Sequence, residues 1–498
     1  MLPPGKSGET DGSHAATARL VDLFQRALQR RNRQEIADRL RGLVLARAPM
    51  AERWFPLAVT AVDLGEITLG RQAIELYIES CQGQPAAHFR KVDFLAYFGA
   101  FDEALALLRT LPATNPDPFA YALSRGTAAL KSGEAREARE WLGEAADMRP
   151  DSGSAWQPLA QLMNFAEEPE LAERLLASQS AMANAPAQER ALYHYALGKL
   201  HADRADPAAA FGAFAQAASE TRALYPYDRA EDRSVAVEAI SGYDADRIAE
   251  LASRQSERTD RSIFVMGLPR SGTTLVEQIL TSHSEVSDGA EIDLLRLLVH
   301  ETGNPSFPAL SGFAQRAGMT PLSSLWRHLL DERFPRSGRV VDKTTDTPWK
   351  LGIAAAVLPQ APLIWLTRDP LDCAWSCFRN CFLRGIRWSN ALEDIAYHFR
   401  IHDSLLTHWQ RYLGDRLLVV PYESLVGDPA AWTRRILAHC GLAEEPQVFS
   451  PQENSRVVAT ASAMQVRRPI NRQAIGSAEP YRQFLQPFID AYPSAEGR

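Results

Sequence analysis

The chain has 498 residues, which is too long for one ordinary core, so two or three domains are expected. Apolar residues make up 46% of it and charged residues 23%, a balance that is typical of globular proteins and excludes a largely disordered chain. The formal net charge of −7 argues against a general nucleic-acid-binding protein, which would be basic.

Residues 1–15 are polar and are expected to form a flexible N-terminal segment without the apolar core of a signal peptide. No stretch approaches the roughly 18 apolar residues that span a bilayer. The five cysteines are too few and too irregular for a disulfide framework, which favours a reducing compartment. The sequence therefore predicts a cytoplasmic protein that does not bind membranes.

Residues 16–224 are rich in alanine and contain an internal repeat. Ala104, Ala138 and Ala172 are separated by 34 and 34 residues (138 − 104; 172 − 138), and leucine, glycine and proline positions keep this interval. The pattern resembles the tetratricopeptide repeat, in which small residues let two antiparallel helices approach closely. The resemblance implies an all-α tetratricopeptide solenoid that holds a peptide or a partner protein. A purely structural or dimerising array is the alternative, and a homodimer is left open.

Residues 225–261 are charged and predict one connecting helix, after which the composition changes at Ser262. Residues 263–266 predict a short buried strand that runs into the glycine loop 267–272 and then into a helix. A strand, a glycine loop and a helix in this order aim backbone N–H groups and a helix N-terminus at a phosphate. An ordinary turn between a strand and a helix is the alternative interpretation.

This loop differs from the loop that binds nucleoside triphosphates. Thr273 occupies the position that lysine normally holds, and the cation, Arg270, lies three residues earlier. An arginine fork with neighbouring hydroxyls and backbone amides still suits a 5′-phosphosulfate.

Residues 363–367 predict a second buried strand, which Arg368 ends, and Asp369-Pro370 begins a helix that is expected to reach residue 383. Ser376 lies eight residues after Arg368 (376 − 368), in the second turn of this helix. A chain that folds back at the proline can bring both side chains to one anion near the helix start. An ion pair between Arg368 and Asp369 or another carboxylate is the alternative.

The loop and the arginine–serine pair are similar to those of the sulfotransferases, most closely the tyrosylprotein sulfotransferase branch. The resemblance covers residues 262–488 and implies a P-loop-like α/β domain with a mainly parallel sheet at 262–498. It implies that the donor is 3′-phosphoadenosine-5′-phosphosulfate (PAPS), that no metal takes part, and that Arg368 and Ser376 hold the 3′-phosphate. The residues implied to hold the 5′-phosphate and the sulfonate are Arg270, Ser271, Gly272, Thr273 and Thr274.

The same resemblance places two further residues beside the nucleotide. Tyr422 follows the predicted strand 417–420, and Arg468 precedes a proline in a basic segment that looks like the family's closing loop. Because an arginine can also be ordinary surface charge, the alternative for Arg468 is a solvated side chain. Cys373 and its neighbours at 377 and 381 are interpreted as packing residues of a helix, since no clustered histidines complete a metal-ligand set.

Glu291, 21 residues after Arg270 (291 − 270), is the implied catalytic base for the acceptor hydroxyl, and an ordinary exposed carboxylate of a turn is the alternative. His283 is a second candidate, because other sulfotransferase branches use histidine, but a packing role at the end of the first helix is favoured. The resemblance assigns Lys343 and Ser462 to the bridging oxygen of the donor, where negative charge develops as the S–O bond breaks. An ion pair with a neighbouring aspartate is the alternative for Lys343.

These observations predict a PAPS-dependent sulfotransferase whose acceptor is protein tyrosine or another peptide-borne hydroxyl. Asp293 stands where the tyrosylprotein branch has a basic residue, so that branch's preference for acidic peptides is not expected to carry over. A P-loop kinase of a small hydroxyl substrate and a non-catalytic repeat scaffold are the alternatives. No nucleic-acid partner is expected.

Overall fold

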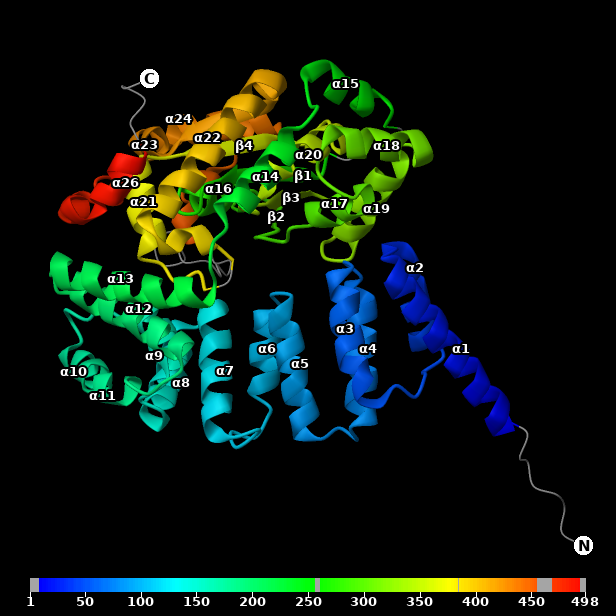
Figure 1. Ribbon diagram of the computed structural model, residues 1–498, viewed down its shortest axis with the longest axis horizontal. Coiled ribbons are helices and arrows are strands. Elements are labelled where there is room, and N and C mark those ends of the chain that lie inside the picture. The colour runs from blue at the N-terminus through cyan, green and yellow to red at the C-terminus, as the bar shows by residue number, and fades with distance from the viewer. Residues whose placement is uncertain (1–8, 256–259, 384, 455–467, 493–498) are drawn as a thin grey trace, which may run out of the picture. The chain divides into compact units, whose positions relative to one another are not determined.

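The computed structural model describes residues 9–255, 260–383, 385–454 and 468–492 (Figure 1). The chain divides into two compact units, one of Met1–Tyr121 with Leu325–Pro335, the other of Ala122–Ser324 with Arg336–Arg498. Throughout the described ranges, every helix is too short or too polar to cross a bilayer.

The N-terminal half of the chain is helical. Its helices are α1 (Glu9–Arg30), α2 (Arg33–Leu45), α3 (Trp54–Asp63), α4 (Ile67–Ser80), α5 (Pro85–Tyr97), α6 (Phe101–Leu108), α7 (Pro118–Lys131), α8 (Ala135–Met148), α9 (Gly153–Leu162), α10 (Pro169–Ala177), α11 (Gln179–Met182), α12 (Ala187–Asp203) and α13 (Pro207–Leu224). Within the first unit, α3 packs against α4 and α5 against α6; within the second, α12 packs against α13. Short turns join the members of each pair, so each pair is a helical hairpin.

The 34-residue interval corresponds to one structural position. Ala104, Ala138 and Ala172 are each the fourth residue of a helix (α6, α8 and α10), and all three are fully buried. Glycine allows the close approach of some helices: a β-carbon on Gly126 would lie 2.7 Å from Leu142, and one on Gly198 would lie 2.6 Å from Phe214. The helical pairs are therefore closely packed at the repeated positions, whereas their assignment to the tetratricopeptide family stays a prediction.

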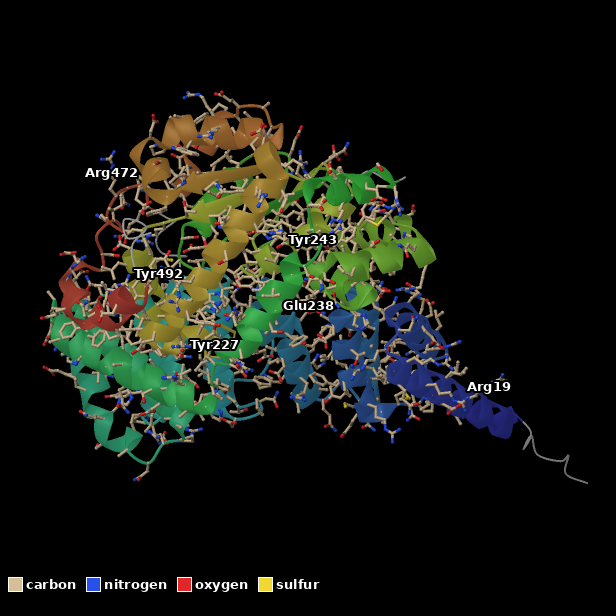
Figure 2. All side chains as sticks on the ribbon, turned by 45° about the horizontal axis from the view of Figure 1, so that its top comes forward. Arg19, Tyr227, Glu238, Tyr243, Arg472 and Tyr492 are labelled. Carbon is tan, nitrogen blue, oxygen red and sulfur yellow. The ribbon has the colours of Figure 1, made fainter. Side chains whose placement is uncertain are left out.

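The segment 225–261 contains two helices, α14 (Arg229–Ile240) and α15 (Ala245–Ser253), where one was expected. Gly242 has a φ of +78°, which ends the first helix, and the Asp244 side chain accepts from the Arg247 N–H at 2.8 Å and begins the second. Tyr243, between them, is buried and donates to the Pro305 carbonyl at 2.9 Å (Figure 2). The domain boundaries expected at 224 and 261 stay predictions. The elements on both sides of each boundary belong to one compact unit.

A five-stranded sheet follows in the second unit. Its strands are β1 (Ser262–Gly267), β2 (Val286–Asp288), β3 (Arg339–Asp342), β4 (Leu363–Thr367) and β5 (Leu417–Pro421), in the order β2-β3-β1-β4-β5. All four strand pairs are parallel, so the carboxyl ends of the strands lie at one edge. The central strand, β1, is buried along its whole length. Ligands of such sheets bind at this carboxyl edge, near the place where the order of the strands reverses.

Helices precede, connect and follow the strands. They are α16 (Thr273–Thr281), α17 (Leu295–Thr302), α18 (Phe307–Ala317), α19 (Thr320–Asp331), α20 (Leu351–Val357), α21 (Pro370–Phe378), α22 (Leu392–Leu413), α23 (Tyr422–Gly427), α24 (Pro429–Cys440) and α26 (Gln486–Ala491). The helix after β4 ends at Phe378, so the expectation that it continues to residue 383 is wrong. Together with the sheet, these helices form an α/β domain in the C-terminal half, apart from α19, which belongs to the first unit from Leu325 onward.

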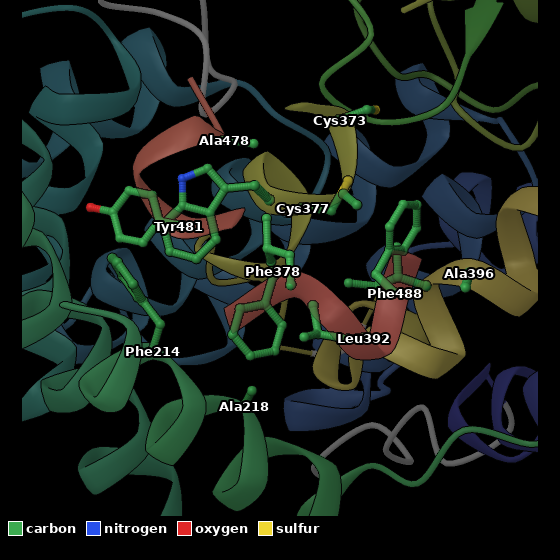
Figure 3. Close-up of a cluster of buried hydrophobic side chains, with 14 of the residues drawn as sticks. Phe214, Ala218, Cys373, Cys377, Phe378, Leu392, Ala396, Ala478, Tyr481 and Phe488 are labelled. Atoms are coloured by element: carbon green, nitrogen blue, oxygen red, sulfur yellow. The ribbon is translucent and has the colours of Figure 1, made fainter. Parts of the chain in front are cut away.

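One apolar cluster joins α13 to α21 and to the C-terminal segment (Figure 3). In it, Phe214 of α13 lies edge-on to Trp375 of α21, and Trp375 stacks on Tyr481 with ring centroids 3.9 Å apart. Cys373 and Cys377 are buried in the same cluster, in agreement with their interpretation as packing residues. Because α21 has already ended, Cys381 lies beyond the helix and is only partly buried.

Candidate functional site

The loop between β1 and α16 is held in a fixed conformation. Gly267 and Gly272 have φ values of +151° and +107°, and a β-carbon on Gly272 would lie 2.6 Å from the Tyr422 ring. Arg270 also has a positive φ, +71°, which is strained for a residue with a side chain. The Ser271 N–H donates to the Leu268 carbonyl at 3.1 Å. A strained residue between two glycines is typical of a ligand-binding turn.

A cavity of about 450 Å³ opens beside this loop. Four arginines line it, Arg270, Arg368, Arg379 and Arg468, and none of the described residues that line it is acidic. The other predicted residues in its lining are Gly272, Thr274, Ser376 and Tyr422. A concave site with four cations and no carboxylate fits a small polyanion.

Arg270 follows strand β1 and Arg368 follows strand β4, and both side chains line this cavity. The Arg270 Nε donates to the Ser376 Oγ at 2.9 Å, and the Arg368 Nη1 donates to the Arg270 carbonyl at 2.9 Å. The guanidinium of Arg368 lies over the Tyr422 ring, 4.8 Å from its centroid. Its buried Nε has no hydrogen-bond partner within the described ranges. The two loops are thus locked together, with one buried N–H of Arg368 left for a ligand.

The alternative ion pair of Arg368 with Asp369 is not found among the described residues. The Asp369 side chain instead accepts from the Asp372 N–H at the start of α21, and Arg368 forms its ion pair with another carboxylate, that of Asp372, at 4.0 Å. Asp372 in turn accepts from the N–H groups of Gly476 (2.7 Å) and Ala478 (2.9 Å). This buried aspartate therefore fixes the chain that follows Arg468 against α21.

The arginines affect one another's protonation. Burial lowers the pKa of Arg270 to about 10, and the positive charges of Arg379 and Arg368 act in the same direction. Burial also lowers the pKa of Arg379. With a pKa of about 10, Arg270 remains charged at neutral pH, and a bound anion would relieve its repulsion by the neighbouring arginines.

Arg379, which lies 11 residues after Arg368 (379 − 368) and directly follows α21, is not among the residues predicted from the sequence. Its spacing of three from Ser376 on the same helical face was the available signal. Asp372 was missed as well, because its role depends on the path of residues 474–478.

Glu291 and Lys343 lie together, but outside the lining of the cavity. The Lys343 Nζ donates to the Glu291 Oε1 at 2.7 Å and lies 4.0 Å from the Glu277 Oε2. Lys343 is 1% exposed and Glu291 48% exposed. Burial lowers the pKa of Lys343, but the charges of Glu277 and Glu291 outweigh burial and the net direction is upward. A charged, buried lysine is thus placed at the end of β3, beside β1.

The other predicted residues lie as follows. Ser271 and Thr273 are buried but do not line the cavity. His283 is buried, its Nδ1 accepts from the Glu285 N–H at 3.1 Å, and its Nε2 lies 3.1 Å from the Ala443 carbonyl. Both ring nitrogens are therefore occupied, which agrees with a packing role. Ser462 lies outside the described residues.

Comparisons with known proteins agree on the C-terminal half. Residues 262–446 match the model described as "Sulfotransferase family". The chain is 27% identical over 380 residues to an uncharacterized protein of Aquifex aeolicus (strain VF5), covering 72% of this chain and 48% of that protein. It is 26% identical over 228 residues to protein-tyrosine sulfotransferase 1 of Danio rerio (43% and 64% covered). To the protein-tyrosine sulfotransferase of Drosophila melanogaster it is 25% identical over 278 residues (51% and 53% covered).

The chain thus spans about half the length of these curated relatives, between 48% and 64%. Among solved structures, the sulfotransferase domain of the Synechococcus PCC 7002 olefin synthase matches with a TM-score of 0.35 and 20% identity, covering 47% of this chain and 97% of that domain. From the family match, the C-terminal half contains a sulfotransferase family domain.

Proposed function

We propose that the protein, whose C-terminal half contains a sulfotransferase family domain, transfers a sulfuryl group from PAPS to an acceptor hydroxyl. The observation that supports this proposal most is the single cavity into which Arg270 and Arg368 both open, without an acidic residue in its described lining. PAPS carries phosphates at both its 5′ and 3′ positions and needs cations at two places.

The two ends of the donor would be bound by different loops. Arg270, Thr274 and the backbone N–H groups at the start of α16 would hold the 5′-phosphosulfate. Arg368 and Ser376, with Arg379 beside them, would hold the 3′-phosphate. Arg468 lines the same cavity and would cover the nucleotide.

The transfer step would be an in-line displacement at sulfur. The acceptor oxygen forms the new S–O bond, the bond from sulfur to the bridging oxygen breaks, and adenosine-3′,5′-bisphosphate leaves with the electron pair. Glu291 would take the acceptor's proton, and Lys343, together with Ser462, would stabilise the charge on the bridging oxygen. For these roles, the 2.7 Å contact between Glu291 and Lys343 would have to open when the substrates bind.

For the acceptor, we propose a peptide-borne hydroxyl such as that of tyrosine. Two relatives that share about a quarter of their aligned residues with this chain are named protein-tyrosine sulfotransferases. The helical N-terminal half, interpreted as tetratricopeptide repeats, would present the peptide.

Titration calorimetry and a transfer assay with labelled PAPS test this function. We expect adenosine-3′,5′-bisphosphate to bind more tightly than adenosine-5′-monophosphate, and label to reach a tyrosine peptide. Transfer of the γ-phosphate from Mg·ATP, with no transfer from PAPS, would identify a kinase and reject the proposal.

A further inference from the structure

A second cavity, of about 540 Å³, adjoins the same phosphate-binding loop. Pro269 lines this second cavity, whereas the next residue, Arg270, lines the first. Thr345 and Asp346, two and three residues after Lys343, line it too. The second cavity therefore borders both the loop and the chain that follows the buried lysine, whereas Glu291 and Lys343 themselves are outside its lining.

A stack of three rings contributes to its wall. His398 lies between Trp388 (centroids 4.2 Å apart, planes at 12°) and Trp349 (5.3 Å, 21°). The His398 Nδ1 is 2.7 Å from the Asp232 Oδ2, and that carboxylate also accepts from the Tyr227 hydroxyl. These contacts fix the three side chains in place, and the small part of each that is exposed (6% to 9%) gives the wall an apolar surface against which a ligand ring can pack.

The charge of this cavity is opposite to that of the first. The acidic residues in its lining are Asp228, Glu231, Asp232 and Asp346, and the basic ones, apart from His398, are Lys350 and Arg387. The Lys350 Nζ is already paired with Asp293 (2.5 Å) and Asp346 (2.7 Å). Glu231 is exposed, and its carboxylate has no ion-pair partner in the part of the chain that the structure describes. Excess negative charge therefore remains available to a ligand.

We infer that this second cavity binds the acceptor and selects an aromatic hydroxyl flanked by positive charge. The inference rests on the proposed function. The aromatic wall accepts the ring, the loop side directs the hydroxyl towards the donor, and the carboxylates at the start of α14 attract a neighbouring ammonium or guanidinium. A phenolic amine and a tyrosine between lysines share this chemistry, whereas a tyrosine between glutamates is repelled.

The test uses the full chain with PAPS and acceptors that differ only in charge. The small acceptors are tyramine, 4-ethylphenol and 3-(4-hydroxyphenyl)propionate, and the peptides are Gly-Lys-Tyr-Lys-Gly and Gly-Glu-Tyr-Glu-Gly. We expect kcat/KM to fall about 1.5-fold to five-fold at each step from cation to neutral to anion, as for exposed charge pairs. The peptide pair should show the same direction, and the ratio of tyramine to the basic peptide tells which source the cavity prefers.

Glu231→Gln should reduce the preference for the cationic acceptor by about 1.5-fold to five-fold. Glu238→Gln is the matched control: Glu238 is exposed, lies on the same helix, α14, and is not in the cavity lining (Figure 2). Glu238→Gln should leave the preference for the cationic acceptor unchanged. An equal loss in both variants would indicate diffuse surface charge and overturn the assignment to this cavity.

Binding of each acceptor in the presence of adenosine-3′,5′-bisphosphate, measured by calorimetry, separates the two proposals. Transfer that favours anionic acceptors, or ignores charge, overturns the inference and leaves the sulfotransferase function intact. Charge-selective binding of phenols without sulfuryl transfer rejects the proposed function and supports the cavity. Failure of every acceptor to bind to a protein that binds the nucleotide overturns the inference.

Discussion

Replacing Arg368 by alanine should remove the selectivity of the protein for a 3′-phosphorylated nucleotide. Arg368 offers a buried Nε–H that has no partner within the described ranges, and its fork can donate two charge-assisted bonds to a phosphate. Each hydrogen bond to a charged group contributes about 1.5 to 3 kcal/mol. After partial compensation by Arg379, the loss of two such bonds should reduce the binding free energy of the 3′-phosphorylated nucleotide by about 3 to 4 kcal/mol. This corresponds to a loss of affinity of about 100-fold to 1000-fold.

Calorimetry should compare adenosine-3′,5′-bisphosphate with adenosine-5′-monophosphate in the wild type and in Arg368→Ala. Arg368 also donates to the Arg270 and Ala474 carbonyls, so its loss will weaken both nucleotides to some extent. The difference between the binding free energies of the two nucleotides measures the contribution of the 3′-phosphate, and this difference should nearly vanish in Arg368→Ala.

Arg472→Ala is the control, because Arg472 donates to the Gly427 carbonyl and is outside the cavity lining (Figure 2). The affinities of Arg472→Ala for both nucleotides should stay within about twofold of those of the wild type, as is usual for surface substitutions. If Arg368→Ala weakens both nucleotides by the same factor, Arg368 does not contact the 3′-phosphate and the reasoning is refuted.

Four further substitutions test the chemistry and the packing. Glu291→Gln and Lys343→Met should each lower kcat by at least about 100-fold while the affinity for adenosine-3′,5′-bisphosphate changes little, and a matching loss of affinity would contradict their roles. Burial raises the pKa of Asp342 to about 6, so the folded protein binds this proton more tightly than the unfolded chain, and stability is lost as pH rises from about 4 to 6. Asp342→Asn should therefore raise Tm at pH 8 and not at pH 4, with about 3 kcal/mol as the upper limit of the gain. Gly198→Ala should destabilise the protein by about 1 to 3 kcal/mol in denaturant unfolding, because its β-carbon would lie 2.6 Å from Phe214, whereas Gly143→Ala, with nothing within 4 Å, should not.

The parts of the site that depend on local sequence could be predicted from it. The strand, loop and helix around Arg270 are adjacent in the chain, and the spacing of Arg368 and Ser376 is set by one helix. The role of Arg379 was not predicted, because its position in the cavity depends on how α21 is oriented over the sheet. The acidic second cavity could not be predicted either, since Glu231 and Asp346 are more than 100 residues apart and meet only in the folded chain.

The single helix expected over 225–261 is interrupted because of the backbone conformation of one residue, which composition does not reveal. Charged, helix-forming residues continue through it, and only Gly242, with φ of +78°, interrupts them. The resulting turn allows Tyr243 to become buried, and it leaves α14 as a separate helix whose first turn supplies acids to the second cavity.

Helix α21 connects the packing of the helical half to the chemistry of the sheet. Its Trp375 and Phe378 stack on or lie beside Phe211 of α13, with centroids 6.2 Å and 5.6 Å away. Its Ser376, and Arg379 at its end, line the anion cavity. Neighbouring positions on a helix point about 100° apart, so one short helix can present an apolar face to α13 and a polar face to the ligand. The positions of two anion-binding side chains therefore depend on an aromatic cluster that need not touch the ligand itself.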